Sequence, residues 1–158
     1  MEAASFINKE NAVIVANSDQ YVSKGIEGFV DKTRTMDNSG LILTMKATGK
    51  KWSYVQRNSI GSISQVKEKV EISTEATVGI YGWSSYQLML DGFNEMFFQK
   101  DLTNGEFYVA PSYNYLINNG IKVFPEFIGD HASNVHGLGT PEDLSNFEQT
   151  KTQIRFND

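Results

Sequence analysis

One carboxylate stands where a buried strand is expected to end. The apolar, β-branched run 12–16 stops abruptly at Asn17-Ser-Asp19-Gln20, a pattern that predicts a buried parallel strand with Asp19 at its carboxyl end. In open α/β sheets, ligands bind at that edge. A carboxylate there can hold Mg²⁺ bound to phosphates, since Mg²⁺ prefers oxygen ligands. Taken alone, Asp19 fits a cap of the following helix better, so other segments must decide.

The composition narrows the classes of function. The chain has 158 residues, no cysteine and a formal net charge of −5, so we expect a single domain over residues 1–158 with a substantial core. Disulfides and thiol chemistry are excluded, and the absence of cysteine suits a cytoplasmic location. Neither a block of basic residues nor a long apolar run is present, which argues against nucleic-acid and membrane partners.

The elements that must position Asp19 alternate between the pattern of a strand and the pattern of a helix. Extended segments are expected at 12–16, 41–47, 54–58, 63–67, 77–83, 106–110 and 121–127, with 59–62 as the turn of a hairpin. Helices are expected up to residue 9 and over 25–34, 84–100, 111–117 and 140–147, the last capped by Thr140 with Pro141 at its first position. This alternation predicts an α/β sandwich of three layers around a mixed, mainly parallel sheet.

The order of several motifs resembles the sugar-phosphate nucleotidyltransferases. The motifs are Val15-Ala-Asn-Ser-Asp-Gln20, Glu68-Lys69, Thr77-Val-Gly-Ile-Tyr81, Gly105-Glu-Phe-Tyr-Val-Ala-Pro111, Tyr113-Asn114 and Gly137-Leu-Gly-Thr-Pro-Glu-Asp-Leu144. They cover nearly the whole chain, and the branch they are most similar to makes precursors of capsules and surface polysaccharides. The resemblance implies transfer of a nucleotide from a nucleoside triphosphate to a sugar 1-phosphate, which releases pyrophosphate and relies on alignment and charge neutralisation.

The resemblance also implies roles at the phosphate end of the site. Asp19 matches the carboxylate that holds Mg²⁺ between the phosphates. Its neighbours Asn17 and Gln20 belong to the same motif and are predicted to contact substrate.

A second group of residues matches the sugar-binding positions of the family. Glu68 would bind sugar hydroxyls and Lys69 the sugar phosphate, because carboxylates accept from paired hydroxyls and lysine offers a compact charge. Gly79 would let the sugar approach the backbone, with Tyr81 near it and Glu106 on ring hydroxyls. Without the family, Glu68 and Lys69 read as a solvated charge run, and the other three as ordinary sheet, core or surface residues.

Three departures from the family pattern limit the activity expected of this chain. The glycine-rich loop Gly-x-Gly-x-Arg, which wraps the triphosphate, does not occur in the sequence. Gly137 stands where many members carry a second metal-binding aspartate, and Val70 replaces the proline after Glu68-Lys69. We therefore expect a fold that is incomplete at its N-terminal side and a chain that is inactive alone.

Two alternatives remain open. A non-catalytic sugar-phosphate-binding or regulatory module could pair with another chain or with itself, through an exposed sheet edge beside Asp19. Transfer to phosphocholine is a further alternative, in which Trp52, Tyr54, Tyr81 and Trp83 would cage a quaternary ammonium. His131 and His136 lack the spacing and the third ligand of a zinc site.

Overall fold

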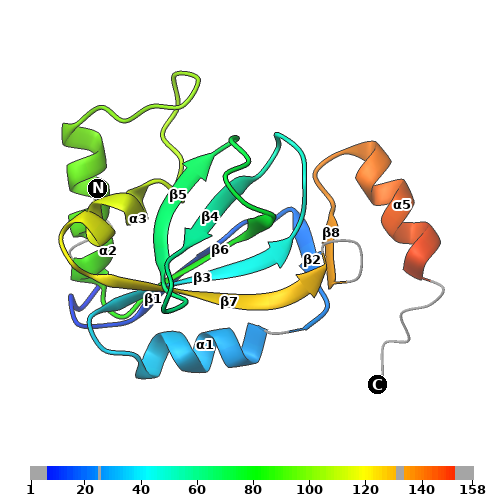
Figure 1. Cartoon of the computed structure of the whole chain (residues 1–158). Coiled ribbons are helices and arrows are strands. Elements are labelled where there is room, and N and C mark those ends of the chain that lie inside the picture. Colours follow the sequence, from blue (N-terminus) through cyan, green and yellow to red (C-terminus); the bar gives the residue numbers. More distant parts are fainter. Residues whose placement is uncertain (1–6, 25, 131–133, 152–158) are drawn as a thin grey trace.

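The computed structural model describes residues 7–24, 26–130 and 134–151 (Figure 1). Its eight strands are β1 Val13–Ala16, β2 Gln20–Val22, β3 Ser39–Lys46, β4 Ser53–Arg57, β5 Ile63–Glu68, β6 Glu75–Trp83, β7 Lys122–Asp130 and β8 Val135–Gly137. The helices are α1 Ile26–Thr35, α2 Tyr86–Phe98, α3 Ser112–Asn118 and α5 Pro141–Lys151. Among the described residues, no helix is both long and apolar enough to cross a membrane.

Six strands form one mixed sheet, which confirms the predicted fold class. The order is β5-β4-β6-β3-β7, and β1 pairs with β6 beside this path. Among the described strands of this sheet, only β3 and β7 pair in parallel, whereas the pairs β1–β6, β3–β6, β4–β5 and β4–β6 are antiparallel. The parallel share of the described sheet is therefore smaller than expected.

The strand before Asp19 differs from its prediction. β1 runs antiparallel to β6, with Val13 opposite Trp83 and Ala16 opposite Ile80. It is not a buried strand either, since half-buried and exposed residues alternate along it. The prediction failed because a short apolar run does not show whether its partner strand is parallel or antiparallel, and the partner here, β6, is antiparallel.

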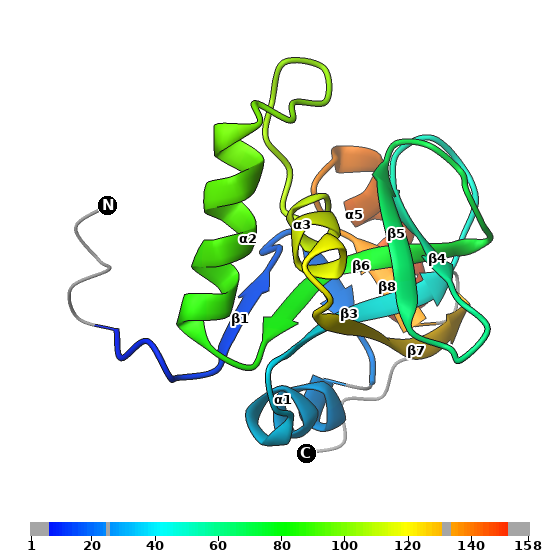
Figure 2. The ribbon, with the colours of Figure 1, turned by 60° about the vertical axis from the view of Figure 1, so that its left-hand side comes forward.

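Helices cover both faces of the sheet and enclose two cores (Figures 1 and 2). On one face, Phe29 of α1 packs with Leu41, Leu43 and Met45 of β3. On the other face, Leu88 of α2 and Tyr113 and Leu116 of α3 pack with Ile42, Trp83 and their neighbours. β6 contributes to both cores because successive side chains of a strand point to opposite faces.

The ends of the helices follow the signals in the sequence. The Ser85 side chain accepts a hydrogen bond from the Leu88 backbone N–H and begins α2. Gly120, with φ +81°, follows the end of α3. Thr140 Oγ1 accepts from the Asp143 N–H at 3.1 Å and begins α5, which extends beyond residue 147 to Lys151.

Several short segments were not predicted correctly, and residues 107–110, which were expected to be extended, belong to no strand. Residues 7–9 are not helical, and the rest of the helix expected before Lys9 lies outside the described residues. β2 and β8 were missed; they form a separate antiparallel pair, with Gln20 opposite Gly137. Strands of three residues are too short for a periodic pattern to reveal them.

Candidate functional site: a pocket over strand β6

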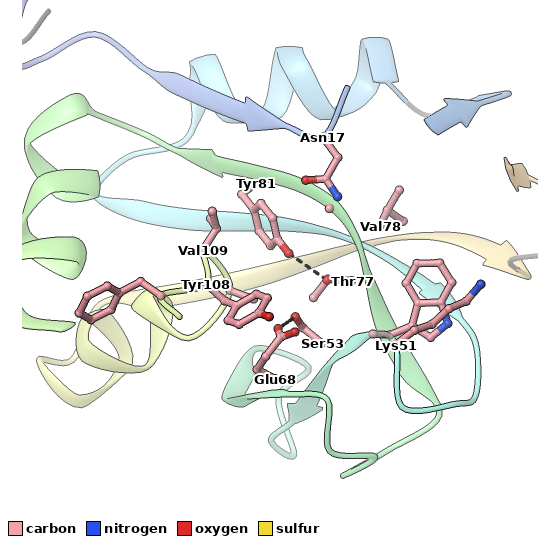
Figure 3. Close-up of a pocket in the computed structure, with 13 residues that line it drawn as sticks. Asn17, Lys51, Ser53, Glu68, Thr77, Val78, Tyr81, Tyr108 and Val109 are labelled. Carbon is pink, nitrogen blue, oxygen red and sulfur yellow. Dashed lines mark hydrogen bonds between the residues drawn. The ribbon is translucent and has the colours of Figure 1, made fainter. Parts of the chain in front are cut away.

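A pocket of about 300 Å³ opens on the face of the sheet that α3 covers. It lies where β6 lacks a side chain, because Thr77, Gly79 and Tyr81 point to the same face and Gly79 leaves a gap between the other two. The lining residues come from the end of β1, from β4 to β6 and from the segment before α3 (Figure 3): Asn17, Lys51, Trp52, Ser53, Glu68, Thr77, Val78, Gly79, Tyr81, Phe107, Tyr108, Val109 and Ala110.

Gly79 also brings the Asn17 amide into the pocket. The Asn17 backbone N–H donates to the Gly79 carbonyl at 2.9 Å, and the side-chain Nδ2 lies 2.4 Å from where a Cβ of residue 79 would stand. The backbone of Gly79 has φ +86°, a conformation that side-chain-bearing residues rarely adopt. The close approach predicted at this glycine is thus made by a neighbouring side chain.

The floor of the pocket is a hydrogen-bonded group of polar side chains (Figure 3). Glu68 is only 8% exposed, and its carboxylate accepts a hydrogen bond from the Ser53 hydroxyl. The Tyr81 hydroxyl lies 3.1 Å from Thr77 Oγ1. Burial raises the pKa of Tyr81 to about 12 and the charge on Glu68 adds to the rise, although bonds to Thr77 and Ser53 oppose it. Tyr81 therefore stays protonated and can serve as a neutral hydroxyl at neutral pH.

The side of the pocket formed by Tyr108, here called its mouth, carries a second polar chain. The Lys69 ammonium donates to the Tyr108 hydroxyl, which in turn donates to Glu106 Oε2 at 2.9 Å. This hydrogen bond raises the pKa of Lys69 above its ordinary value. Tyr108 lines the pocket, whereas Lys69 and Glu106 are not among the lining residues. The pocket therefore combines a buried carboxylate with an ammonium group that is bonded to one of its lining side chains.

Asp19 and Gln20 lie at the β2–β8 pair and do not line the pocket. The Asp19 carbonyl accepts from the Leu138 N–H at 2.8 Å, and its carboxylate Oδ2 lies 2.6 Å from where a Cβ of Gly139 would stand. The Asp143 carboxylate approaches the position of a Gly137 Cβ to 3.4 Å. Glycines at 137 and 139 thus leave room beside one short segment for two carboxylates, the exposed one of Asp19 and the half-buried one of Asp143.

These two carboxylates are a limited set of metal ligands. Across residues 7–24, 26–130 and 134–151, no group of three or more His, Cys, Asp or Glu side chains is arranged to hold a metal ion. Mg²⁺ nevertheless often takes only one or two protein carboxylates and completes its shell with water and phosphate oxygens. The donor chemistry around Asp19 fits that manner of binding. His131 lies outside the described residues, and His136 is in β8.

The sequence predicted part of this arrangement. Asn17, Glu68, Gly79 and Tyr81 line one pocket, and Lys69 and Glu106 join Tyr108 at its mouth. Ser53, Thr77 and Tyr108 were missed as site residues, and Trp52 was named only for the aromatic cage. For Ser53 the signal was the predicted hairpin, since pairing β4 with β5 sets Ser53 opposite Glu68.

The aromatic cage for a quaternary ammonium is not formed. Tyr54 and Trp83 are fully buried, and they belong to the cores on opposite faces of the sheet. Trp52 and Tyr81 line the pocket, but the Lys51 ammonium lies 4.7 Å from the centre of the Trp52 ring. The two buried rings have packing roles, and this removes the basis of the phosphocholine alternative.

Comparison with known proteins by sequence finds no relative. No protein-family model matches the chain, and no curated protein sequence matches it.

Comparison with solved structures finds the fold in nucleotidyltransferases. A nucleoside-diphosphate-sugar pyrophosphorylase from Vibrio cholerae RC9 superposes with a TM-score of 0.73 at 24% identity, over 93% of this chain and 59% of the other. A protein described as a glucose-1-phosphate thymidylyltransferase from Bacillus anthracis gives 0.72 at 17% identity, over 99% and 61%. An inositol-1-phosphate CTP transferase from T. maritima gives 0.63 at 11% identity, over 99% and 60%.

The chain therefore has a nucleotidyltransferase-like α/β fold and spans about three fifths of the length of these proteins. The resemblance predicted from the order of the motifs is confirmed at the level of the fold.

Proposed function

We propose that this chain binds a sugar 1-phosphate in the pocket over β6, as the sugar-binding part of a nucleotidyltransferase that makes a nucleotide-sugar and pyrophosphate. By itself it binds this substrate without transferring a nucleotide. The observation that carries the proposal is the gathering of Asn17, Glu68, Gly79 and Tyr81, which the sequence singled out separately, around one pocket.

The chemistry of the pocket supports a polyhydroxylated, anionic ligand. The Glu68 carboxylate, backed by Ser53, offers an acceptor to sugar hydroxyls in a buried setting, where hydrogen bonds to charged groups are strong. The Asn17 amide can donate and accept. Lys69 at the mouth supplies the positive charge that a phosphate group needs. A phosphate beside Lys69 and a sugar ring between Glu68 and the Asn17 amide would contact all of these groups.

A magnesium ion would be held at Asp19, with Asp143 as the second carboxylate within reach of the same segment. When bound, it would neutralise phosphate charge and orient the phosphates for in-line attack. The chain's own contribution there is to keep the Asp19 carboxylate in place, through the Leu138 N–H bond to the Asp19 carbonyl and the space beside Gly139.

Calorimetric titration of the purified chain with glucose, galactose and mannose 1-phosphates, with and without Mg²⁺, tests the proposal. We expect at least one hexose 1-phosphate to bind more tightly than inorganic phosphate, since the pocket would contact the hydroxyls of the sugar ring as well as the phosphate. Absence of binding to all three at millimolar concentration would contradict the proposal. Release of pyrophosphate in the presence of nucleoside triphosphates, Mg²⁺ and the same sugars would instead refute the claim of inactivity.

A second candidate function is that of a non-catalytic module that pairs with another polypeptide chain. It is favoured by β1, whose only described partner strand is β6. Ile14 on this strand is 36% exposed, and a hollow beside it is lined by Glu10, Asn11, Ala12, Val30 and Arg34. Proline and charged side chains, which discourage pairing, occur at the β7 edge of the sheet but not within β1.

Light scattering at high protein concentration tests self-pairing through β1. The Ile14→Lys variant should lower the average mass, whereas Phe127→Lys on the β7 edge should leave it unchanged. A strictly monomeric wild-type protein would contradict self-pairing.

A further inference from the structure

Tyr108 connects the inside of the pocket to the charged groups at its mouth. Its phenol ring lines the pocket. Its hydroxyl accepts a hydrogen bond from the Lys69 ammonium and donates one to Glu106 Oε2 at 2.9 Å. The ammonium also lies 4.4 Å from the centre of the Tyr108 ring, within the range of a cation–π contact. One side chain thus orients both a cation and an anion.

The backbone at Lys69 shows why such a partner is needed. Glu68 ends β5 and points into the pocket, so in a regular strand the next side chain would point to the opposite face. Lys69 instead has φ +58°, a left-handed conformation that is unfavourable for a residue with a side chain. Its N–H donates to the Trp52 carbonyl at 3.0 Å, which fixes this turn. The turn allows the ammonium to reach Tyr108 on the pocket side.

A free lysine side chain would sample many rotamers in this place. Lysine carries a compact charge on four flexible methylenes, and ordering them costs conformational entropy each time a ligand binds. Tyr108 holds the end of the chain before any ligand arrives. The pocket then presents the cation at a fixed distance from Glu68, and preorganisation of this kind increases affinity.

We propose that Tyr108 is a positioning residue, which holds the Lys69 ammonium at the pocket mouth so that the pocket selects a phosphorylated sugar over the free sugar. This inference rests on the proposed function, because it concerns how the same site reads the anionic group of its ligand.

The test compares wild type with Tyr108→Phe, which keeps the ring and removes the hydroxyl. NMR titrations with hexose 1-phosphates and with the corresponding free hexoses give the ratio of the two affinities. We expect the variant to bind the phosphorylated sugar roughly three- to tenfold more weakly and the free sugar unchanged, since only the bond that orients the cation is lost. An equal loss for both ligands, or no loss, would overturn the proposal.

Tyr115→Phe is the matched control. Tyr115 is also half-buried, and its hydroxyl also donates to a carboxylate, Asp101 Oδ2 at 3.0 Å, but it does not line the pocket. This variant should keep both affinities. Loss of the phosphorylated ligand in Tyr115→Phe as well would show a general effect of removing surface hydroxyls and would overturn the role of Tyr108.

A ligand-free measurement separates this inference from the proposed function. The carbon-13 resonance of Lys69 Cε, followed against pH, reports the pKa of its ammonium. We expect a lower pKa in Tyr108→Phe than in wild type, and an equal pKa would overturn the positioning role. If wild type binds no hexose 1-phosphate, the proposed function fails, while this titration still decides whether Tyr108 holds Lys69.

Discussion

The pocket over β6 and the segment around Asp19 differ in how their polar groups are supported. In the pocket, Glu68 is buried and bonded to Ser53, and Tyr81 is bonded to Thr77. Asp19 is exposed, and what places it is a backbone bond and the space beside a glycine. The contrast indicates that the proposed sugar site is already formed in this chain, whereas the proposed metal site depends on groups that a phosphate ligand would bring.

The largest expected effect comes from closing the gap at Gly79. Gly79→Ala should lower the free energy of unfolding by about 2 kcal/mol, because of its positive φ and the collision with Asn17. Binding of hexose 1-phosphates should disappear with it. Urea denaturation measures the first effect and calorimetry the second.

Gly28→Ala is the control for this substitution. Gly28 lies in α1, and a Cβ there would meet nothing within 4 Å. The change should increase stability by about 0.5–1 kcal/mol, because glycine is unfavourable inside a helix. A similar loss in both variants would show that the pocket has no special need for glycine.

Glu68→Gln should come next in size. We expect at least a roughly tenfold loss of affinity for hexose 1-phosphates, because a charged acceptor is replaced by a neutral one inside the pocket. Glu95→Gln is the matched control, since Glu95 is bonded to Gln99 at the end of α2 and lies outside the pocket lining. Equal affinities for Glu68→Gln and wild type would remove Glu68 from the site.

The pocket floor also predicts a pH dependence of stability. The pKa of Tyr81 is raised from 10.0 to about 12 in the folded protein, mainly by burial. The contribution of this shift to the free energy of unfolding is fully present below the pKa of Tyr81 in the unfolded chain. It is lost as the pH rises through the pKa of Tyr81 in the folded protein. Between pH 10 and 12 the free energy of unfolding should fall more steeply in wild type than in Tyr81→Phe, as measured by urea denaturation. Parallel pH profiles would show that Tyr81 is open to water.

The smallest effect on stability is expected at Asp19. Asp19→Asn should change the free energy of unfolding by no more than about 0.5 kcal/mol, as is usual for exposed residues. It should abolish any increase in sugar-phosphate affinity that Mg²⁺ produces in wild type. Gly139→Ala should weaken the same increase, because its Cβ would displace the Asp19 carboxylate. If Mg²⁺ increased the affinity of both variants as much as that of wild type, Asp19 would not be a metal ligand.

The sequence predicted the β6 region well because its signals are local. The run of β-forming residues over 77–83 identified the strand, and the turn at 59–62 identified the hairpin that brings Glu68 to it. Gly79 and Tyr81 could be chosen from the order of the motifs.

Other features depend on tertiary pairing and could not be read from local patterns. The direction of β1 is set by β6, which lies more than sixty residues away. Tyr108 reaches Lys69 only after the segment before α3 folds over β5, and the motif at 105–111, in which it lies, pointed to Glu106 alone.

Strand β6 has a glycine on each of its faces, and each glycine leaves a notch, that is, a space without a side chain. Gly79 leaves the gap that Asn17 and the pocket occupy, whereas Gly82 lies against Thr33 and Phe29 of α1. Their spacing of three residues places them on opposite faces. A one-residue insertion or deletion between them would put both notches on one face, so that either the pocket or α1 would lose the space that a glycine leaves for it. Length variation should therefore be absent from residues 79–82 in any natural variant that keeps both.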